Sequence, residues 1–227
     1  MKLTIVMPVL NEADGIAAAL AALRPLRARG AEVIVVDGGS TDGTPDLARA
    51  HADRVLSGAR GRAAQMNAGA DAAAGDVLLF LHADTRLPGD ADGLVRNALA
   101  GARVWGRFDI AFEDGALPLV AASMNLRSRA TGIATGDQAM FVTREAFASV
   151  GGFPAIALME DIALSARLKR LSRPACLSAR VTTSPRRWRA HGTLRTVLTM
   201  WRLRLAFFLG ADPARLARAY GYGYGGN

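Results

Sequence analysis

Apolar runs alternate with polar, helix-compatible segments along the first third of the chain. The runs at residues 3–7, 32–36 and 76–81 predict buried strands, and a shorter strand is expected at 54–57. Residues 11–23, 45–52 and 61–73 are predicted to be helices, because capping residues or glycine stand at their starts. Continuous apolar strands separated by helices indicate an α/β fold, with a mostly parallel central sheet and helices on both faces.

The second half of the chain has a less regular pattern. Residues 136–142 and 151–154 frame a predicted loop–strand–helix–loop, and residues 162–171 are compatible with a helix. Residues 194–209 predict a basic amphipathic helix, in which arginines stand among large apolar residues. We therefore expect a main domain over residues 1–193 and a C-terminal helical extension over residues 194–227.

Composition excludes several classes of protein. Of the 227 residues 51% are hydrophobic, which suffices for a substantial core, and the one cysteine excludes an intramolecular disulfide and a cysteine-rich zinc site. No run of 18 apolar residues predicts a membrane-spanning helix, and the first residues lack the cleavage site of a signal peptide. We expect a cytoplasmic protein.

The net charge of +8 is unevenly distributed. Residues 1–161 carry 15 basic and 19 acidic side chains, whereas residues 162–227 carry 13 basic side chains and a single acidic one, Asp212. The basic segment at residues 162–227 could bind the phosphates of a nucleotide, a nucleic acid or an anionic membrane. Arginines that are simply exposed to solvent give the same composition. The predicted helix at 194–209 suits the inner face of a membrane, docking on the main domain or a homodimer seam.

Polar residues follow three of the predicted strands. Asn11 and Glu12 follow the first strand, Asp37 the second, and His82 and Asp84 the third. Ligands of open α/β sheets bind beyond the carboxyl ends of the strands. Three such clusters in succession indicate a polar ligand, together with a metal.

Asp84 is the best candidate metal ligand, because Mn²⁺ and Mg²⁺ prefer oxygen ligands and combine one or two carboxylates with substrate phosphates. If the third strand continues, His82 lies on the same face as Asp84. A structural hydrogen bond of His82 is an equally good interpretation. The glycine-rich turn after Asp37 is neither a P-loop nor a dinucleotide-binding fingerprint.

Two adjacent carboxylates, Glu160 and Asp161, precede the predicted helix at 162–171. The helix dipole favours acidic residues at this place, and a general base that deprotonates an acceptor hydroxyl is the sharper hypothesis. Asp137 and Gln138 lie in a loop that is expected to wall the same site. The candidate diphosphate-binding donors near the C-terminus are Arg186, Arg187, Trp188 and His191.

Taken together, these motifs resemble a family 2 glycosyltransferase of the GT-A fold. Residues 7–12 resemble the family's P-x-x-N-E, residues 35–44 its V-V-D-D-G-S-x-D-G-T, and residues 61–69 its G-x-x-x-A-x-N-x-G helix. Residues 81–84 match the L-D-A-D metal motif, and Glu160-Asp161 the E-D base motif. The resemblance covers about residues 1–195. It departs from the family at Gly38 and His82, each of which replaces an aspartate.

The resemblance implies a Rossmann-like GT-A fold and an inverting transfer from a nucleoside-diphosphate sugar of the UDP or GDP type, with Mn²⁺ or Mg²⁺. The acceptor is expected to be a small molecule or lipid-linked. Asp161 is the implied base with Glu160 beside it, and Asp84 and His191 are the candidate metal ligands. The expected nucleotide-sugar-binding residues are Pro8, Leu10, Asn11, Glu12, Asp37, Gly38, Arg62, Gln65, Asn67, His82, Ala83 and Asp84.

The short length, His-Ala-Asp-Thr at 82–85 and Arg-Arg-Trp-Arg at 186–189 also resemble a bacterial subgroup associated with radical-SAM and selenium-related domains. Two other interpretations stay open. A sugar nucleotidyltransferase shares the nucleotide-binding architecture, but it usually carries a glycine-rich, basic turn after the first strand. A non-catalytic membrane- or RNA-binding protein explains the basic C-terminal region but not the carboxylates, so we expect no nucleic-acid partner.

Overall fold

A computed structural model describes residues 1–221, except for the side chains of Arg187 and His191. The strands are β1 (Leu3–Val9), β2 (Glu32–Asp37), β3 (Arg54–Ser57), β4 (Val77–Phe80), β5 (Thr85–Arg86), β6 (Trp105–Phe112), β7 (Phe141–Thr143) and β8 (Ala175–Thr183). The α-helices are α1 (Ala13–Ala22), α2 (Arg24–Ala28), α3 (Thr44–Arg49), α4 (Arg62–Ala72), α5 (Ala91–Ala98), α6 (Pro118–Thr131), α7 (Arg144–Ser149), α8 (Glu160–Leu168), α9 (Arg186–His191), α10 (Thr193–Phe208) and α11 (Pro213–Ala219). Two 3₁₀ turns are η1 (Glu113–Gly115) and η2 (Gly136–Gln138).

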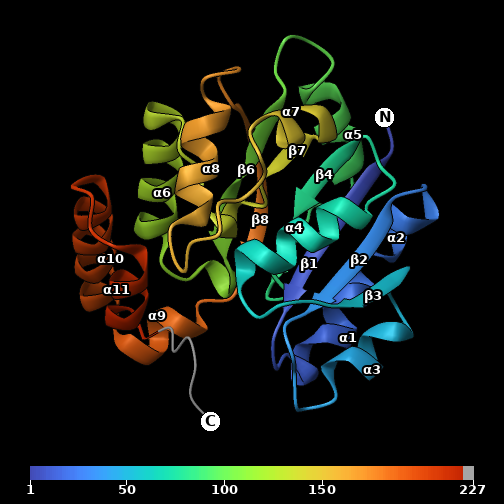
Figure 1. Cartoon of the computed structure of the whole chain (residues 1–227), viewed down its shortest axis with the longest axis horizontal. Coiled ribbons are helices and arrows are strands. Elements are labelled where there is room, and N and C mark those ends of the chain that lie inside the picture. Colours follow the sequence, from blue (N-terminus) through green and yellow to red (C-terminus); the bar gives the residue numbers. More distant parts are fainter. Residues whose placement is uncertain (222–227) are drawn as a thin grey trace.

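One sheet with the strand order β3-β2-β1-β4-β7-β6-β8-β5 forms the centre of the molecule (Figure 1). The first four strands of this order are parallel, as predicted. β7 runs antiparallel to both β4 and β6, β8 is again parallel to β6, and β5 pairs antiparallel with β8. The expectation of a mixed α/β fold with a mostly parallel sheet is thereby confirmed.

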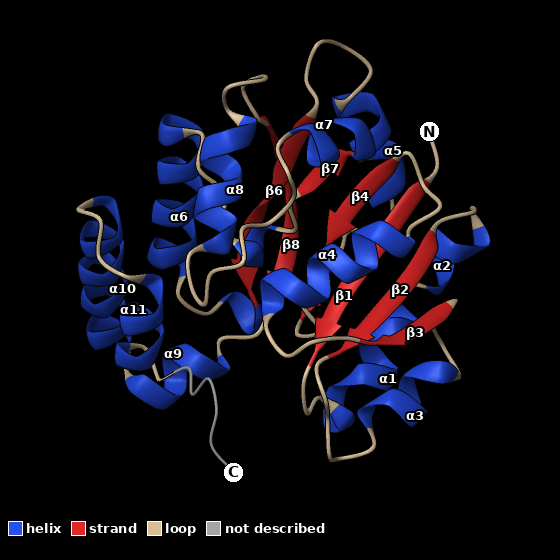
Figure 2. Cartoon of the chain, viewed as in Figure 1, coloured by secondary structure: helices blue, strands red, loops and turns tan. Residues whose placement is uncertain are grey.

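Alternate residues of each strand point to opposite faces of the sheet, and each face has its own core. Helices surround the sheet (Figure 2). Ile5, Val33 and Leu79 face one core, to which α1, α5 and α6 contribute buried residues. Val6 and Leu78 face the other core, which α4, α7 and α8 cover. The continuous apolar strands of the sequence are therefore explained by burial on both sides.

The predicted strand limits differ from the structure at two places near the candidate site. β1 continues through Pro8, whose fixed φ is compatible with extended backbone, and ends at Val9. β4 ends at Phe80, so that His82 and Asp84 lie in a turn rather than on a continuing strand. The sequence predicts His82 and Asp84 on one strand face only if the strand continues to them. Because β4 ends before His82, that prediction does not apply.

The C-terminal helices pack onto the main domain through a third, smaller core. Leu203 of α10 and Leu216 of α11 are buried with Leu158, Met159 and Ile162, which precede and begin α8. Within the described part of the chain, none of the helices combines the length and hydrophobicity that crossing a bilayer requires. The division into residues 1–193 and 194–227 stays a prediction, because α10 begins at Thr193 and shares a core with α8.

Candidate functional site

The carboxyl ends of β1 and β2 are tied together by the polar residues that the sequence singles out. Asn11 accepts a hydrogen bond from the Thr41 N–H at 2.9 Å through its Oδ1, and its own N–H donates to Ser40 Oγ at 2.9 Å. The N–H of Glu12 donates to Thr44 Oγ1 at 2.9 Å. These contacts leave Asn11 exposed at the sheet edge. Pro8 and Leu10 are half-buried beside it.

Asp37 ends β2 and organises the turn that follows. Its carboxylate is 4% exposed and accepts hydrogen bonds from the N–H groups of Gly39 and Ser40 at 2.9 and 3.0 Å. The Ser40 hydroxyl donates to the same carboxylate. These bonds compensate the burial of the charged group and hold the turn open toward the strand ends.

Gly38 stands where the resembled motif has an aspartate, and the structure gives a physical reason for the difference. A Cβ at Gly38 would lie 3.0 Å from the side-chain amide of Gln65. That amide is buried and donates through Nε2 to the carbonyls of Val9 and Val36, both at 2.8 Å. Gln65 therefore links the ends of β1 and β2 from within, and its role toward a nucleotide stays a prediction.

Asn67 is also occupied by a structural contact. Its Nδ2 donates to the Phe153 carbonyl at 2.9 Å, and its Oδ1 accepts from the Phe153 N–H at 3.0 Å. This pair of bonds fastens α4 to the loop before α8. The predicted contact of Asn67 with a nucleotide sugar has to compete with these bonds.

Asp84 lies next to Arg186, a cation that is distant from it along the chain. Arg186, at the start of α9, donates to Glu12 Oε1 at 2.8 Å, and its Nε lies 3.9 Å from Asp84 Oδ2. These contacts raise the pKa of Arg186, and the hydrogen bond to Glu12 is the main cause. Arg186 thus joins the β1 and β4 ends, a contact that the sequence did not predict, and its role as a diphosphate donor stays a prediction. Ala83, in the same turn, packs against the core.

His82 lies against η2. Its Nδ1 is 3.4 Å from Asp137 Oδ1, and a Cβ at Gly136 would come within 2.7 Å of the imidazole ring. Only a glycine permits this approach. His82 and Asp84, the two polar residues at the metal motif, therefore have different neighbours. His82 lies beside Asp137, and Asp84 lies beside Arg186.

Asp161 is held in place by backbone donors at the start of α8. Its Oδ2 accepts from the Gly136 N–H at 2.8 Å, and its Oδ1 accepts from its neighbour Ile162 at 2.7 Å. Because Gly136 also packs on His82, η2 connects the candidate base with the turn that carries Asp84. The half-buried carboxylate has a fixed orientation, as a general base needs.

Glu160 is buried beside it, with 6% exposure. Burial raises the pKa of Glu160 to about 7, and the neighbouring Asp161 adds to the increase. Arg62, at the start of α4, and His82 act in the opposite direction on this pKa. Arg62, His82 and both carboxylates are therefore electrostatically within reach of one another.

Two residues predicted to bind the diphosphate or acceptor make contacts within the protein, and their predicted roles stay predictions. Gln138 is fully buried, and its Oε1 accepts from the Thr135 N–H at 3.2 Å, which caps η2. Trp188 packs edge-on against Phe112, with ring centroids 5.8 Å apart. The side chains of Arg187 and His191 lie outside the described residues, so their predicted roles, including His191 as a metal ligand, stay predictions.

The backbone around the site adopts uncommon conformations. Asn11, Ala139 and Met159 have φ angles of 53°, 45° and 71°. A positive φ is costly for residues with a Cβ and persists where the surroundings impose it. Asn11 follows β1, Ala139 follows η2 and Met159 precedes α8. The strained backbone therefore lies at the edges of the site.

Sequence reasoning missed two half-buried arginines near the candidate base. Arg127 of α6 has Nε and Nη2 buried without a hydrogen-bond partner, and Arg204 of α10 has Nε in the same condition. Burial is the main cause that lowers the pKa of Arg127, to about 10, and Arg204 contributes repulsion. Arg204 appeared in the sequence only as one arginine of a helix, and no local signal marked Arg127.

The fit of a divalent cation rests on Asp84. The side chain of Asp84 is 29% exposed, and its oxygens have weak protein contacts, a 3.3 Å hydrogen bond from Thr85 and the 3.9 Å approach of Arg186. Among the described residues no cluster of three or more His, Cys, Asp or Glu side chains is arranged to hold a metal. One carboxylate completed by substrate phosphates fits the way in which proteins bind Mg²⁺.

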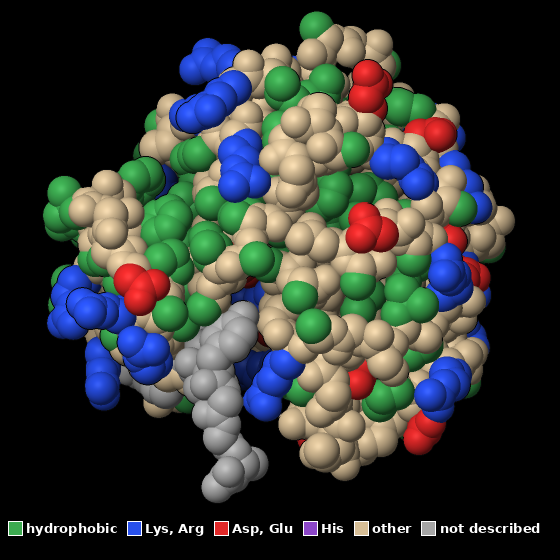
Figure 3. Space-filling model, viewed as in Figure 1, with side chains coloured by type: hydrophobic (Ala, Val, Ile, Leu, Met, Phe, Trp, Pro, Cys, Tyr) green, Lys and Arg blue, Asp and Glu red, His purple; other side chains and the backbone are tan. Residues whose placement is uncertain are grey.

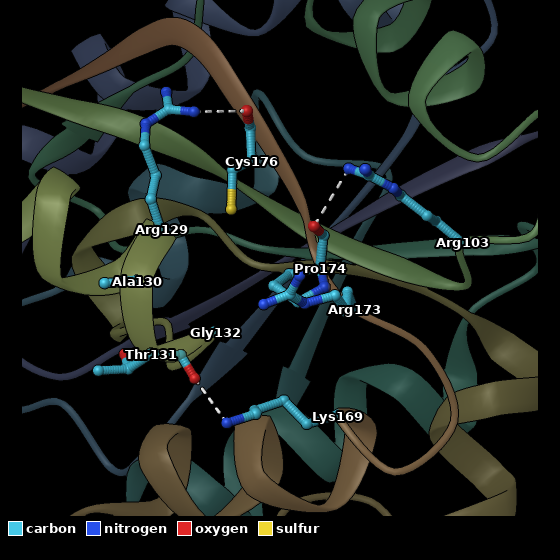
Figure 4. A pocket seen from close by; sticks show the side chains of 9 residues that line it. All are labelled: Arg103, Arg129, Ala130, Thr131, Gly132, Lys169, Arg173, Pro174 and Cys176. Carbon is cyan, nitrogen blue, oxygen red and sulfur yellow. Dashed lines mark hydrogen bonds between the residues drawn. The ribbon is translucent and has the colours of Figure 1, made fainter.

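A basic hollow of about 510 Å³ lies between the end of α6 and residues 169–176 (Figure 4). Arg103 donates to the Pro174 carbonyl, Arg129 to the Cys176 carbonyl and Lys169 to the Thr131 carbonyl. None of the strand-end residues described above lines it. Because three of its four cations donate to backbone carbonyls, we place the functional site at the strand ends.

Comparisons with known proteins address the family of the chain. The model of the family "Glycosyl transferase family 2" matches residues 4–141, more than half of the chain. "Succinoglycan biosynthesis protein ExoA" of Rhizobium meliloti (strain 1021) is 40% identical over 111 residues, covering 42% of this chain and 32% of ExoA. The match therefore spans about a third of the length of that relative.

Solved structures show the same fold. Glucosyl-3-phosphoglycerate synthase from Mycobacterium tuberculosis, in complex with Mn²⁺, UDP and glucosyl-3-phosphoglycerate, is 24% identical, with a TM-score of 0.61 over 80% of this chain and 70% of that one. The mannosyltransferase PcManGT from Pyrobaculum calidifontis, in complex with GDP-Man and Mn²⁺, is 21% identical, with a TM-score of 0.65 over 97% and 69%. S. aureus TarS in complex with UDP-GlcNAc is 19% identical, with a TM-score of 0.68 over 81% and 58%. The ordered strand-end motifs, the GT-A fold and the family match lead to one conclusion: the chain belongs to glycosyl transferase family 2.

Proposed function

We propose that this protein transfers a sugar, with inversion, from a nucleoside-diphosphate sugar to an acceptor hydroxyl. The observation that carries the proposal is that contacts link Asp84 to the end of β1 and Asp161 to the turn that carries His82 and Asp84. Arg186 contacts both Asp84 and Glu12, while Gly136 donates to Asp161 and packs on His82. Neighbours of the same fold were crystallised with UDP, UDP-GlcNAc or GDP-Man, which supports a donor of the UDP or GDP type.

In the proposed reaction Asp161 accepts the proton of the acceptor hydroxyl. The acceptor oxygen forms a bond to the anomeric carbon from the face opposite the diphosphate, and the bond from that carbon to the diphosphate oxygen breaks with its electron pair. A Mn²⁺ or Mg²⁺ ion on Asp84 would neutralise charge on the diphosphate. Arg186, 62% exposed and oriented by Glu12, adds a cationic donor at the same place.

Glu160 has a supporting role in this scheme. Because its raised pKa keeps it protonated at higher pH than an ordinary carboxyl, two adjacent charges are avoided at the start of α8. Glu160 is therefore a positioning residue and Asp161 is the base. Asp37 and Asn11 shape the edge against which the nucleotide binds.

The test of this function is the Asp161→Asn variant. General-base catalysis typically contributes a factor of about 100 to 10,000, so transfer should fall by that factor while binding of UDP or GDP with Mn²⁺ is retained. Glu145→Gln, a change on an exposed part of α7, is the matched control and should leave transfer unchanged. Unchanged transfer by Asp161→Asn contradicts the assignment of the base.

A thermal-shift screen of UDP-, GDP- and dTDP-sugars with Mn²⁺ identifies the donor, because a ligand that binds the folded state raises its stability. No shift with any of these nucleotide sugars contradicts the proposed donor class. Membership of the radical-SAM- and selenodomain-associated subgroup remains part of the proposal. The family match speaks against the nucleotidyltransferase and the non-catalytic RNA-binding protein.

A peripheral membrane location at the inner face is a further part of the proposal, and α10 carries it. The large apolar residues Leu194, Leu198, Trp201, Leu205 and Phe208 recur at helical spacing and are 58–72% exposed. α10 has no acidic residue, and Arg195 and Arg202 are exposed on it. In Figure 3, basic side chains gather at the lower left of the molecule, at the end where Figure 1 places α10 and α11. An exposed apolar stripe with flanking arginines complements an anionic bilayer.

The membrane proposal predicts co-sedimentation with phosphatidylglycerol vesicles, weaker binding to phosphatidylcholine vesicles, and loss of both when Leu198 and Trp201 are changed to serine. Leu119→Ser, at an exposed position of α6, is the control and should retain binding. If the chain forms a homodimer through this stripe and ignores vesicles, the bilayer is the wrong occupant. A lipid-linked acceptor is then disfavoured relative to a small molecule.

A further inference from the structure

Two half-buried arginines near the candidate base have buried guanidinium nitrogens without a hydrogen-bond acceptor. They are Arg127 of α6, through Nε and Nη2, and Arg204 of α10, through Nε. A buried donor without a partner loses its hydration and gains nothing in return, which is unfavourable for a neutral group and more so for a charged one. Such donors are expected where a ligand completes them.

Their charged surroundings place both groups near the candidate base. Asp161 and Asp137 act on both arginines in the direction that favours the charged form, opposing the effect of burial on the pKa. Arg204 and Arg107 act on Arg127 in the opposite direction, because three cations gather in one region. Arg107 itself is paired with Asp109.

Packing of the C-terminal helices brings Arg204 to this place. Leu203, its neighbour on α10, is buried against Met159 and Ile162, which flank Glu160 and Asp161. In Figure 1, α10 lies at the same left-hand end of the molecule as α6 and α8. The basic extension of the chain thus contributes one half-buried arginine to the site, while Arg202 of the same helix stays exposed.

We propose that Arg127 and Arg204 bind an anionic group of the acceptor, a phosphate or a carboxylate, next to the hydroxyl that Asp161 deprotonates. This inference rests on the proposed glycosyl transfer. Guanidinium groups bind both kinds of anion through paired N–H donors. The donor diphosphate has other candidate partners, because the cation at Asp84 is Arg186. The acceptor class is therefore a hydroxy acid or a phosphorylated alcohol, with the anion close to the reacting hydroxyl.

The test uses the full chain saturated with UDP or GDP, whichever binds more tightly, and Mn²⁺, so that the diphosphate position is filled. Glycerol 3-phosphate, D-glycerate and glycerol are the probes, and their dissociation constants are measured by calorimetry. Binding of the two anions, and at least tenfold weaker binding of neutral glycerol, is expected. Arg127→Gln and Arg204→Gln should each weaken anion binding about tenfold, the loss of one charge-assisted interaction.

Arg202→Gln is the matched control, because it removes the same charge from an exposed position of α10. It should leave the dissociation constants unchanged. If either glutamine variant fails to fold, arginine Nε–H signals in the NMR spectrum of the unaltered protein replace it, and two of them should shift on titration with glycerol 3-phosphate. Absent signal shifts contradict the site.

The outcomes separate this inference from the proposed function. If the nucleotide binds with Mn²⁺ but the anions bind no better than glycerol, the acceptor-anion site is wrong and the transferase assignment stands. If Arg127→Gln or Arg204→Gln weakens nucleotide binding and leaves anion binding unchanged, these arginines hold the diphosphate and the inference is wrong. If no nucleotide binds, the proposed function itself fails.

Discussion

The two halves of the sheet treat their polar groups differently. In the half built from β1 to β4, Asp37, Asn11, Gln65 and Asn67 are tied into backbone hydrogen bonds. Among the described residues, the buried side-chain nitrogen and oxygen atoms without a partner all lie in the other half, in Arg107, Arg127, Ser128, Gln138 and Arg204.

The difference bears on how the proposed transferase would recognise its two substrates. The hydrogen bonds of the first half are satisfied within the protein, so we propose that this half is a preformed frame for the nucleotide. The second half combines buried guanidinium nitrogens, Glu160 with a raised pKa and strained backbone at Ala139 and Met159. Unmet hydrogen bonds and strain are tolerated where a ligand completes a site.

Removal of the carboxylate at Asp84 is expected to have the largest effect. Asp84→Asn should lower transfer roughly 100-fold or more, because a metal that stabilises the leaving diphosphate contributes several kcal/mol. The rate is measured over a Mn²⁺ series, where the variant should need more metal or fail to respond. Asp90→Asn, an exposed change before α5, is the control. If the Mn²⁺ dependence of Asp84→Asn equals that of the unaltered protein, Asp84 is not a metal ligand.

A change at Glu160 tests the second half through pH. Since the pKa of Glu160 is raised from 4.5 to about 7, the folded state binds its proton more tightly than the unfolded state does. Its contribution to stability is complete below pH 4.5 and is lost as the pH rises through 7, by about 3 kcal/mol. Denaturant unfolding between pH 5 and pH 8 should show that this loss is absent in Glu160→Gln. Glu145→Gln should keep the loss of stability between pH 5 and pH 8. If the free energy of unfolding depends on pH equally in both variants, burial of Glu160 does not raise its pKa.

Asn67→Ala tests the connection between the halves. It removes both hydrogen bonds to the backbone of Phe153, whose ring packs on Phe80 and Phe147. We expect a loss of about 2 kcal/mol in the free energy of unfolding, from two part-buried bonds. Asn97→Ala, at an exposed position of α5, should change it little. Equal stabilities of the two variants would show that the loop before α8 is not fastened by Asn67.

Gly38→Ala is expected to have the smallest effect and tests the completeness of the first half. The new Cβ would lie 3.0 Å from the Gln65 amide, which two carbonyls hold in place. A loss of about 1 kcal/mol in the free energy of unfolding is expected from the displaced amide. Gly15→Ala in α1, where a Cβ meets nothing within 4 Å, should be neutral or stabilising. A stabilised Gly38→Ala would mean that Gln65 is free to move.

The sequence predicted the first half well because its signals are local. Apolar runs mark β1, β2 and β4, and the residues that follow each strand meet at one edge, because parallel strands end on the same side. The second half gave weaker signals. β6 and β8 were not predicted, since their strands contain Arg107, Asp109 and Arg180, which interrupt the apolar pattern.

By itself, the sequence determined the α/β class, the family, the order of the strand-end motifs and the candidates Asp37, Asp84 and Asp161. Only the tertiary structure decided that Arg186 meets Asp84, that His82 turns to Asp137, and that Arg127 and Arg204 are half-buried near the candidate base. Arg127 and Arg204 are 77 positions apart in the chain. Periodicity and motifs describe residues within one element, whereas burial and electrostatic pairing depend on which distant elements pack together.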